Sequence, residues 1–265
     1  VVDPLAIIRD NGAHILRLWV ASTEYFEDVR IGKEVLAGSC HAYRKLRNTF
    51  RYLLGAIGDF TEEEQIDVAA MPELVRWVLH RLALLAAELR AAAEGFGFNR
   101  YIRAITSFSN DDLSAFFFDI RKDSLYCDAP TSAKRRAYRT VLNEVFEALV
   151  RWVAPILCFT AEEVWQSRYP EAASVHLETW PTVDAGWRDA ALGEKWELLR
   201  ALRTRVTEAI EAMRRDKVIR SSLEAQVALG LAEPDLLAAV NSVEFDEICI
   251  VSELAAVGSE HDGVS

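Results

Sequence analysis

The chain is organised around the stretch Tyr43-Arg44-Lys45-Leu46-Arg47-Asn48-Thr49-Phe50-Arg51-Tyr52-Leu53-Leu54. At about 100° per residue, its polar side chains share roughly a 100° arc of one helix face: Arg44, Arg47, Asn48 and Arg51. The apolar side chains fall on a separate arc that can face a core: Tyr43, Leu46, Phe50, Leu53 and Leu54. The stretch therefore predicts an amphipathic helix whose polar face carries no acid.

Two readings of this basic face stay open. It is either the solvated flank of a helix or a surface that reads phosphates and bases, for which Arg supplies a planar donor fork and Asn a donor and an acceptor. The formal net charge of −11 does not exclude the second reading. At physiological salt a charge cluster acts over only about 8 Å, so local charge decides.

Length and composition indicate an ordinary globular protein. The 265 residues are 51% hydrophobic and 27% charged, which fits one large domain or two modest ones. The longest apolar runs fall short of a membrane span, and no secretory leader opens the chain. The four cysteines form no CxxC pair, so we expect a reduced protein of the cytoplasm that lacks disulfides.

Motifs for chemistry are missing from the sequence. The five histidines show neither H-E-x-x-H nor zinc-finger spacing, and there is no glycine-rich phosphate loop and no G-x-S-x-G. We therefore predict no catalytic residue, no metal site and no cofactor site within this chain.

Apolar periodicity predicts a run of helices joined by short connections. They cover residues 4–20 with a break at Gly12, 33–55, 73–94, a helix from 99 bent around 109–111, 132–153, and a short helix opened by a capping box at 160–163. The expected architecture of this part is an antiparallel helical bundle.

The pattern changes after Pro170. An extended segment at 174–181 leads to a long helix over 187–217. Two β-like runs at 225–229 and 247–251 then flank a helix near 234–240, and a polar tail from 258 is expected to be disordered. The predicted fold class is therefore mainly α, with a small α+β module after the bundle.

Five stretches resemble bacterial isoleucyl-tRNA synthetases, which are class I aminoacyl-tRNA synthetases. The residues are Gly12 to Ser22, Tyr43 to Arg51, Ser114 to Asp123, Ala154 to Trp165 and Lys217 to Ala225. The Ala154 stretch is shared with valyl and leucyl enzymes, whereas the Ser114 and Lys217 stretches favour the isoleucyl branch. The resemblance extends to about Val251 and points to the region downstream of the catalytic domain.

The resemblance implies a division of labour along a longer protein. Val1 to Pro4 would lie just past the family's Lys-Met-Ser-Lys-Ser loop, so ATP and Mg binding, adenylate formation and editing would belong to upstream domains. Within this chain the expected parts are the end of the stem-contact region, the helical anticodon-binding domain, the C-terminal junction module and the tail, at residues 1–31, 32–172, 173–257 and 258–265. Many members continue into a zinc-binding segment, so zinc is possible only beyond the C-terminal end.

The implied function is the tRNA-recognition part of an isoleucine–tRNA ligase, which attaches isoleucine to its tRNA with ATP. The implied partners are isoleucine tRNA and the upstream domains of the same chain, with no membrane and a monomeric state. The residues expected to contact tRNA are Arg44, Arg47, Asn48, Arg51, Tyr52 as a stacking residue, Arg135, Arg136 and Arg139. A third basic patch, interrupted by Asp216, comprises Arg214, Arg215, Lys217 and Arg220. His14 stands where the family usually has Asp, so no role is carried over to it.

Alternatives remain at this stage. The chain could be the same module of a valyl or leucyl enzyme, or a helical protein-interaction scaffold with no nucleic-acid role. The scaffold would leave the acid-free basic face unexplained. A stand-alone enzyme fits least, because no nucleophile–base pair is present.

Overall fold

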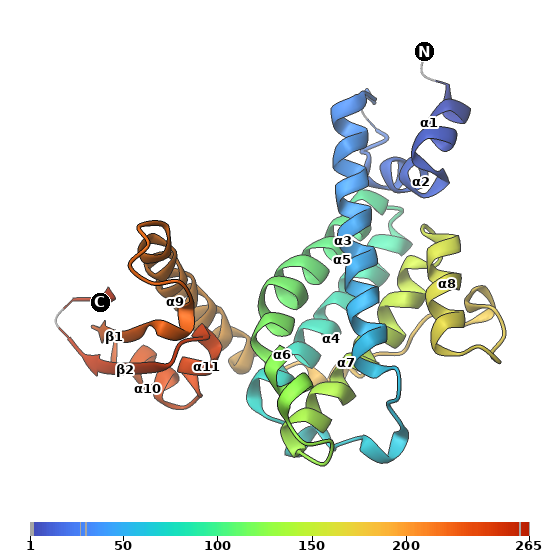
Figure 1. Cartoon of the computed structure of the whole chain (residues 1–265). Helices are drawn as coiled ribbons and strands as arrows, with labels where there is room; N and C mark the ends of the chain where they lie inside the picture. Colours follow the sequence, from blue (N-terminus) through green and yellow to red (C-terminus); the bar gives the residue numbers. More distant parts are fainter. Residues whose placement is uncertain (1–2, 27, 30, 260, 265) are drawn as a thin grey trace. The chain divides into compact units, whose positions relative to one another are not determined.

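A computed structural model of the chain describes residues 3–26, 28–29, 31–259 and 261–264. The chain divides into two compact units, Val1–Arg188 and Asp189–Ser265, and each is described by itself. The first unit is a helical bundle and the second combines helices with a small sheet, as the sequence predicts (Figure 1).

The first unit contains eight α-helices and one π-helix among its described residues. Their bounds are α1 Pro4–Asn11, α2 Ala13–Ser22, α3 Lys33–Ile57, α4 Glu73–Glu94, α5 Phe98–Ser107, the π-helix η3 Phe108–Phe117, α6 Phe118–Cys127, α7 Ala133–Val153 and α8 Cys158–Arg168. Short 3-10 turns cover Glu62–Glu64, Val68–Ala70, Val175–Leu177 and Ala185–Trp187.

Local sequence explains the bounds of the first two helices. Asp3 accepts a hydrogen bond from the Leu5 amide at 2.9 Å and Pro4 fills the first turn, so α1 starts there. Gly12, with φ of 88°, separates α1 from α2 in a backbone conformation that other residues rarely adopt. The bend expected around 109–111 falls in the π-helix, a ten-residue segment of wider turns that continues α5 into α6.

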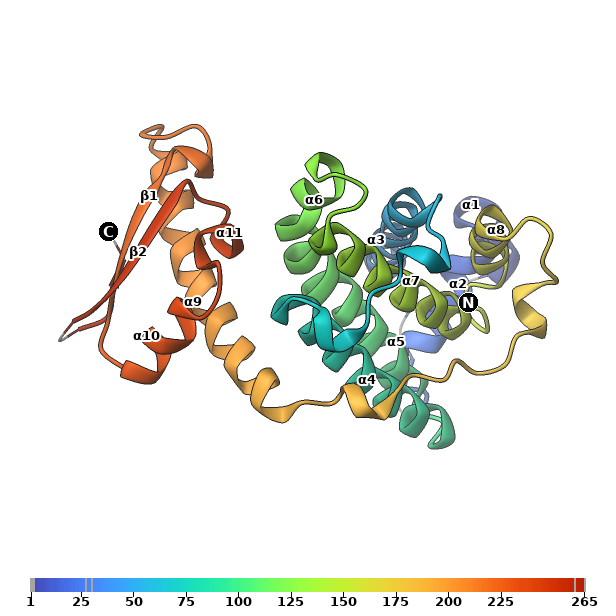
Figure 2. The same ribbon diagram turned by 90° about the horizontal axis from the view of Figure 1, so that it is seen from below.

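The bundle core is built from large aromatic side chains. Those with less than 2% exposure include Trp77, Trp152, Tyr138, Phe117 and Phe146. They come from α4, α7 and η3, which pack together with α3 in the middle of the unit (Figure 2).

The segment after α8 belongs to the bundle, so the predicted boundary between residues 172 and 173 lies too early. Trp180 packs against Tyr101 and Trp152 with ring centroids 6.2 and 6.4 Å apart, and Arg90 lies 5.7 Å from its ring. Arg188 Nη2 donates to the Ala83 carbonyl at 3.4 Å. These contacts hold an irregular segment against α4, α5 and α7, which composition alone does not show. The predicted boundary at residue 31 also falls inside the first unit.

The second unit contains α9 Ala190–Arg215, β1 Gln226–Leu231, α10 Pro234–Asn241, α11 Phe245–Cys249, β2 Glu253–Gly258 and β3 Gly263–Val264, with a 3-10 turn at Ser222–Glu224. The sheet order is β2-β1-β3, with β1 parallel to β2 from Gln226↔Glu253 to Leu231↔Gly258 and antiparallel to β3. Helix α9 contacts α10, α11 and β3.

Two predictions for this unit are wrong. The apolar run at 247–251 falls largely in α11, which ends at Ile250 in the left-handed conformation, and the second strand is Glu253–Gly258. A short apolar run does not distinguish a buried helical turn from a strand. The tail expected to be disordered contributes β3, although Glu260 and Ser265 lie outside the described residues.

Candidate nucleic-acid interface

Helix α3 presents the basic face that the sequence predicts. Arg44, Arg47, Asn48 and Arg51 are all exposed, and they occupy successive turns of the helix. On the opposite side, Leu46, Phe50 and Leu53 are buried against the bundle. Because its apolar side is packed, α3 holds the four polar side chains in a fixed row along about two turns.

An acid from another helix enters this face. Glu163 of α8 lies with one carboxylate oxygen 3.2 Å from Arg47 Nη2, and both side chains are more than half exposed. Arg47 Nη1 also lies 3.5 Å from the Tyr43 hydroxyl. The hydrogen bond to Tyr43 and the charge of Glu163 raise the pKa of Arg47 above its ordinary value. Arg47 is therefore a paired cation, and the face is free of acid only along its own helix.

Arg44 and Arg51 differ from Arg47 in this respect. Among the residues that the structure describes, no carboxylate lies within 4 Å of either guanidinium. Arg44 Nε makes a long hydrogen bond of 3.4 Å to the Cys40 carbonyl one turn earlier. Most of the donor capacity of these two side chains is therefore open to an external acceptor such as phosphate.

A groove of about 260 Å³ runs between α3 and α8. Arg47, Asn48, Arg51 and Glu163 line its polar side, and Phe50, Leu54 and Val164 line its apolar side. The groove joins side chains more than 100 residues apart in sequence.

Tyr52, predicted as a stacking residue, is partly engaged within the bundle. Its ring is half-buried and stacks on Phe118 with centroids 4.1 Å apart and planes inclined by 16°. Its hydroxyl lies 2.9 Å from that of Tyr138, and burial raises the pKa of Tyr52 to about 12. One face of the ring is occupied and the hydroxyl is bonded within the protein, so stacking of a base by Tyr52 stays a prediction that can involve only the other face.

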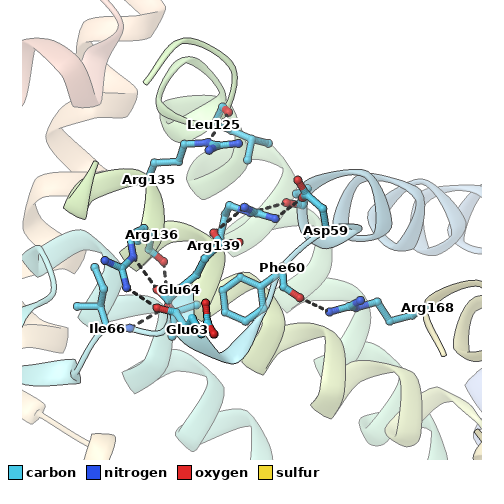
Figure 3. Close-up of polar contacts among 12 residues, drawn as sticks. Asp59, Phe60, Glu63, Glu64, Ile66, Leu125, Arg135, Arg136, Arg139 and Arg168 are labelled. Carbon is cyan, nitrogen blue, oxygen red and sulfur yellow. Dashed lines mark hydrogen bonds and ion pairs between the residues drawn. The ribbon is translucent and has the colours of Figure 1, made fainter. Parts of the chain in front are cut away.

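Arg139, the deepest member of the second predicted cluster, is buried. Its side chain is only 3% exposed, and Nε donates to the Ala56 carbonyl at 3.0 Å (Figure 3). The two terminal nitrogens form ion pairs with Glu64, at 2.6 Å, and with Asp59. Arg139 therefore fastens the loop after α3 to α7, and the prediction that it contacts tRNA is wrong.

Arg135 and Arg136 are half-buried, and their guanidinium groups donate hydrogen bonds to backbone carbonyls. Arg136 donates to the carbonyls of Glu63 and Glu64 at 2.6 and 3.1 Å, and Arg135 Nε donates to the Leu125 carbonyl at 3.1 Å (Figure 3). These contacts explain why a basic first turn is tolerated at the start of α7, where the helix dipole disfavours cations. Their contact with tRNA stays a prediction; among the described residues, Arg136 uses two of its nitrogens within the protein, whereas Arg135 uses only Nε.

His14 replaces the predicted capping box at the start of α8. The helix begins at Cys158, so Thr160 lies inside it and cannot be its N-cap. The Phe159 amide donates to His14 Nε2 at 3.1 Å, which requires that nitrogen to be unprotonated. A neutral ring then carries its proton on Nδ1, which faces Thr160 Oγ1 at 3.1 Å, and this oxygen lies 2.9 Å from the Tyr43 hydroxyl. The His14 ring thereby joins α2 to α8, and Thr160 continues the connection to α3.

Burial of the His14 ring, together with the nearby Arg17 and Arg47 guanidiniums, lowers the pKa of His14 below 6.5. Arg17 itself donates to the carbonyls of Ile156 and Pro155 at 2.9 and 2.7 Å. These bonds satisfy carbonyls in the turn between α7 and α8, so Arg17 has a structural role.

The third basic patch surrounds a surface hollow of about 620 Å³ in the second unit. Arg214, Arg215, Lys217 and Arg220 line it, together with Glu211, which pairs with Arg214. Lys217 lies two residues after the end of α9 in the left-handed conformation, with φ of 60°.

Within the described ranges, no three His, Cys, Asp or Glu side chains are placed to hold a metal ion. No described helix is long and apolar enough to cross a membrane.

Comparison with known proteins identifies a family to which the chain is similar. Residues 75–229 match the model described as the anticodon-binding domain of tRNA ligase. The chain is 55% identical to an isoleucine–tRNA ligase of Zymomonas mobilis, covering 100% of the chain and 29% of that protein. It is 50% identical to an isoleucine–tRNA ligase of Agrobacterium fabrum, covering 98% of the chain and 27% of that protein. The chain thus spans less than a third of these curated relatives.

A solved structure shares the fold. It is the ternary complex of Agrobacterium radiobacter K84 agnB2 LeuRS, tRNA and LeuAMS, with a TM-score of 0.55 and 17% sequence identity. The match covers 98% of the present chain and 30% of that chain.

Proposed function

Because the chain belongs to the anticodon-binding domain family of tRNA ligases, we propose that it is the tRNA-recognition part of an isoleucine–tRNA ligase. Its partner is isoleucine tRNA, which it binds as a monomer in the cytoplasm. Attachment of isoleucine with ATP belongs to the whole ligase, and we expect this chain alone to have no such activity. Identity of about half of the residues to two isoleucine–tRNA ligases supports the isoleucine assignment.

The observation that carries this proposal is the row of exposed polar side chains on α3. Arg44 and Arg51 offer guanidinium donors with no described carboxylate within 4 Å, as phosphate contacts require. Asn48 lies between them and supplies an amide that can both donate and accept. The tRNA-binding set that we retain is therefore Arg44, Arg47, Asn48 and Arg51.

The direct test measures binding of the 265-residue chain to isoleucine tRNA, beside the same tRNA with an exchanged anticodon, at two salt concentrations. We expect salt-sensitive binding that weakens with the wrong anticodon. Binding that is blind to the anticodon would move base reading elsewhere, and absence of binding at low salt would refute the proposal.

Arg51→Ala tests the face itself. If Arg51 contacts phosphate, its removal should weaken binding to both tRNAs equally and reduce the salt slope by about one contact. Arg100→Ala is the matched control, because Arg100 is an exposed arginine of α5 that pairs with Glu88 at 3.0 Å. Equal effects of the two substitutions would show that only net charge matters.

A further inference from the structure

We propose that the groove between α3 and α8 holds one unstacked tRNA base, and that Glu163 determines which base is accepted. This inference rests on the proposed function and extends it from a phosphate-binding face to a base-reading pocket. Glu163 belongs to α8 and lies more than 100 residues after the basic face in the sequence, so nothing in the α3 pattern indicates it.

The first argument is the hydrogen-bonding character of the Arg47–Glu163 pair. A phosphate carries only acceptors and a negative charge, so it gains nothing from a carboxylate beside the arginine. The edge of a base carries donors and acceptors side by side, which is the complement of a guanidinium next to a carboxylate. The 3.2 Å ion pair therefore suits a base edge better than a phosphate.

The unused acceptor positions of Glu163 also favour a base edge as the ligand. Oxygen Oε1 accepts from Arg47, while no described donor is placed on Oε2. An ionised carboxylate has about four lone-pair positions, so both oxygens can still accept N–H groups. Both side chains are more than half exposed, so a ligand in the groove can reach them.

Size and lining fit a single ring system. The volume of about 260 Å³ lies below the roughly 300–1,000 Å³ of pockets for drug-sized ligands. Of the apolar lining residues, Phe50 and Val164 are buried and the half-buried Leu54 can contact the face of a ring, while Asn48 adds an amide at the polar side. Arg44 and Arg51 continue along α3, where the phosphates on either side of an extruded base can bind.

The carboxylate defines the class of base. Guanine, cytosine and adenine each carry an exocyclic amino group that donates to a carboxylate, and guanine adds an adjacent ring N–H. Uracil has one ring N–H between two carbonyls, so one carbonyl can accept from Arg47 but the other opposes the carboxylate. The pocket should therefore favour an amino-bearing base over uracil.

The test depends on whether Glu163→Gln raises or lowers the affinity for tRNA. Glu163→Gln removes one negative charge from a surface that binds a polyanion, so electrostatics alone predicts tighter binding of every tRNA. If Glu163 accepts from a base, the same substitution should weaken binding of isoleucine tRNA by about 5- to 150-fold. The control is Glu171→Gln, which removes the same charge from an exposed residue beyond the end of α8 and outside the groove.

A panel of isoleucine tRNAs, each with one anticodon-loop base exchanged for uracil, locates the base. We expect one exchange to weaken binding to the unsubstituted chain markedly and to have a much smaller effect on Glu163→Gln. Glu163→Asp keeps the charge and withdraws the carboxylate by one methylene, so it should also lose affinity. Thermal unfolding of each variant confirms that the fold is retained.

If Glu163→Gln binds isoleucine tRNA as tightly as the unsubstituted chain or more tightly, or if its base preference is unchanged, the proposal that Glu163 selects a base in the groove is refuted. In that case salt-sensitive binding by the unsubstituted chain would leave the proposed function standing. Failure of the unsubstituted chain to bind tRNA at low salt would refute the proposed function and this inference together.

Discussion

Replacement of Arg139 by Met should destabilise the bundle severely. The arginine is 3% exposed and donates to three acceptors: the Ala56 carbonyl in the last turn of α3, and the carboxylates of Asp59 and Glu64 in the segment that follows (Figure 3). Met retains the apolar stem but none of the donors. The Ala56 carbonyl then loses its partner, and Glu64 keeps its charge in a site where its side chain is only 22% exposed.

The expected loss follows from how each partner can recover. Removing one member of a buried ion pair costs about 3–5 kcal/mol, because the other charge stays buried. Asp59 is 87% exposed and recovers its hydration from water, which lowers the cost. An orphaned buried carbonyl adds about 1–3 kcal/mol if it finds no water. We therefore expect a loss of about 3 kcal/mol in the free energy of unfolding.

Urea denaturation followed by circular dichroism measures this quantity, and Arg44→Met provides the control. Arg44 is exposed and has no described ion pair, so its replacement should change stability by less than about 0.5 kcal/mol. A loss below about 1 kcal/mol for Arg139→Met would refute the structural role. A loss of tRNA affinity without a loss of stability would instead return Arg139 to the list of tRNA ligands.

Two further predictions concern the connections of the bundle. The pKa of His14 is lowered in the folded state, so the contribution of this residue to stability is complete above pH 6.5 and should be lost as the pH falls through the folded pKa. Urea titrations at several pH values should show this loss. His14→Asn should remove this pH dependence of the unfolding free energy. Trp180→Ala should cost about 2 kcal/mol in unfolding free energy, less than a fully buried tryptophan because Trp180 is half-buried. Leu177→Ala, at a side chain 76% exposed in the same segment, should be nearly neutral.

Regular periodicity made the helical part of the fold predictable. The apolar stripe between Glu73 and Glu94 predicts the bounds of α4, and Gly12 marks a helix break that the structure confirms. The two faces of α3 follow from the same reasoning, because side-chain direction on a helix depends on position alone. Where the local pattern is strong, the sequence suffices.

Partners from distant helices could not be predicted in the same way. Arg47 and Glu163 are joined only by the packing of α3 against α8, and Arg139 is buried only because the loop after α3 folds over it. The predicted capping box failed for a related reason, since His14 supplies the acceptor that a local Thr would otherwise provide. An arginine in a sequence carries no mark that separates an exposed phosphate ligand from a buried clamp, because both use the same donors.

The structure sorts the arginines in a way that bears on specificity. Arg139 is buried and paired inside the bundle, Arg135 and Arg136 donate to backbone carbonyls, and Arg47 forms an ion pair with Glu163. The α3 face is then left with two open cations, in a chain of net charge −11. Two phosphate contacts to a single-stranded loop give a salt slope of only about −1.4, which is shallow for a nucleic-acid ligand. An interface with so little non-specific attraction must draw its affinity from shape and base contacts, so selection of the correct tRNA follows directly from the scarcity of free charge.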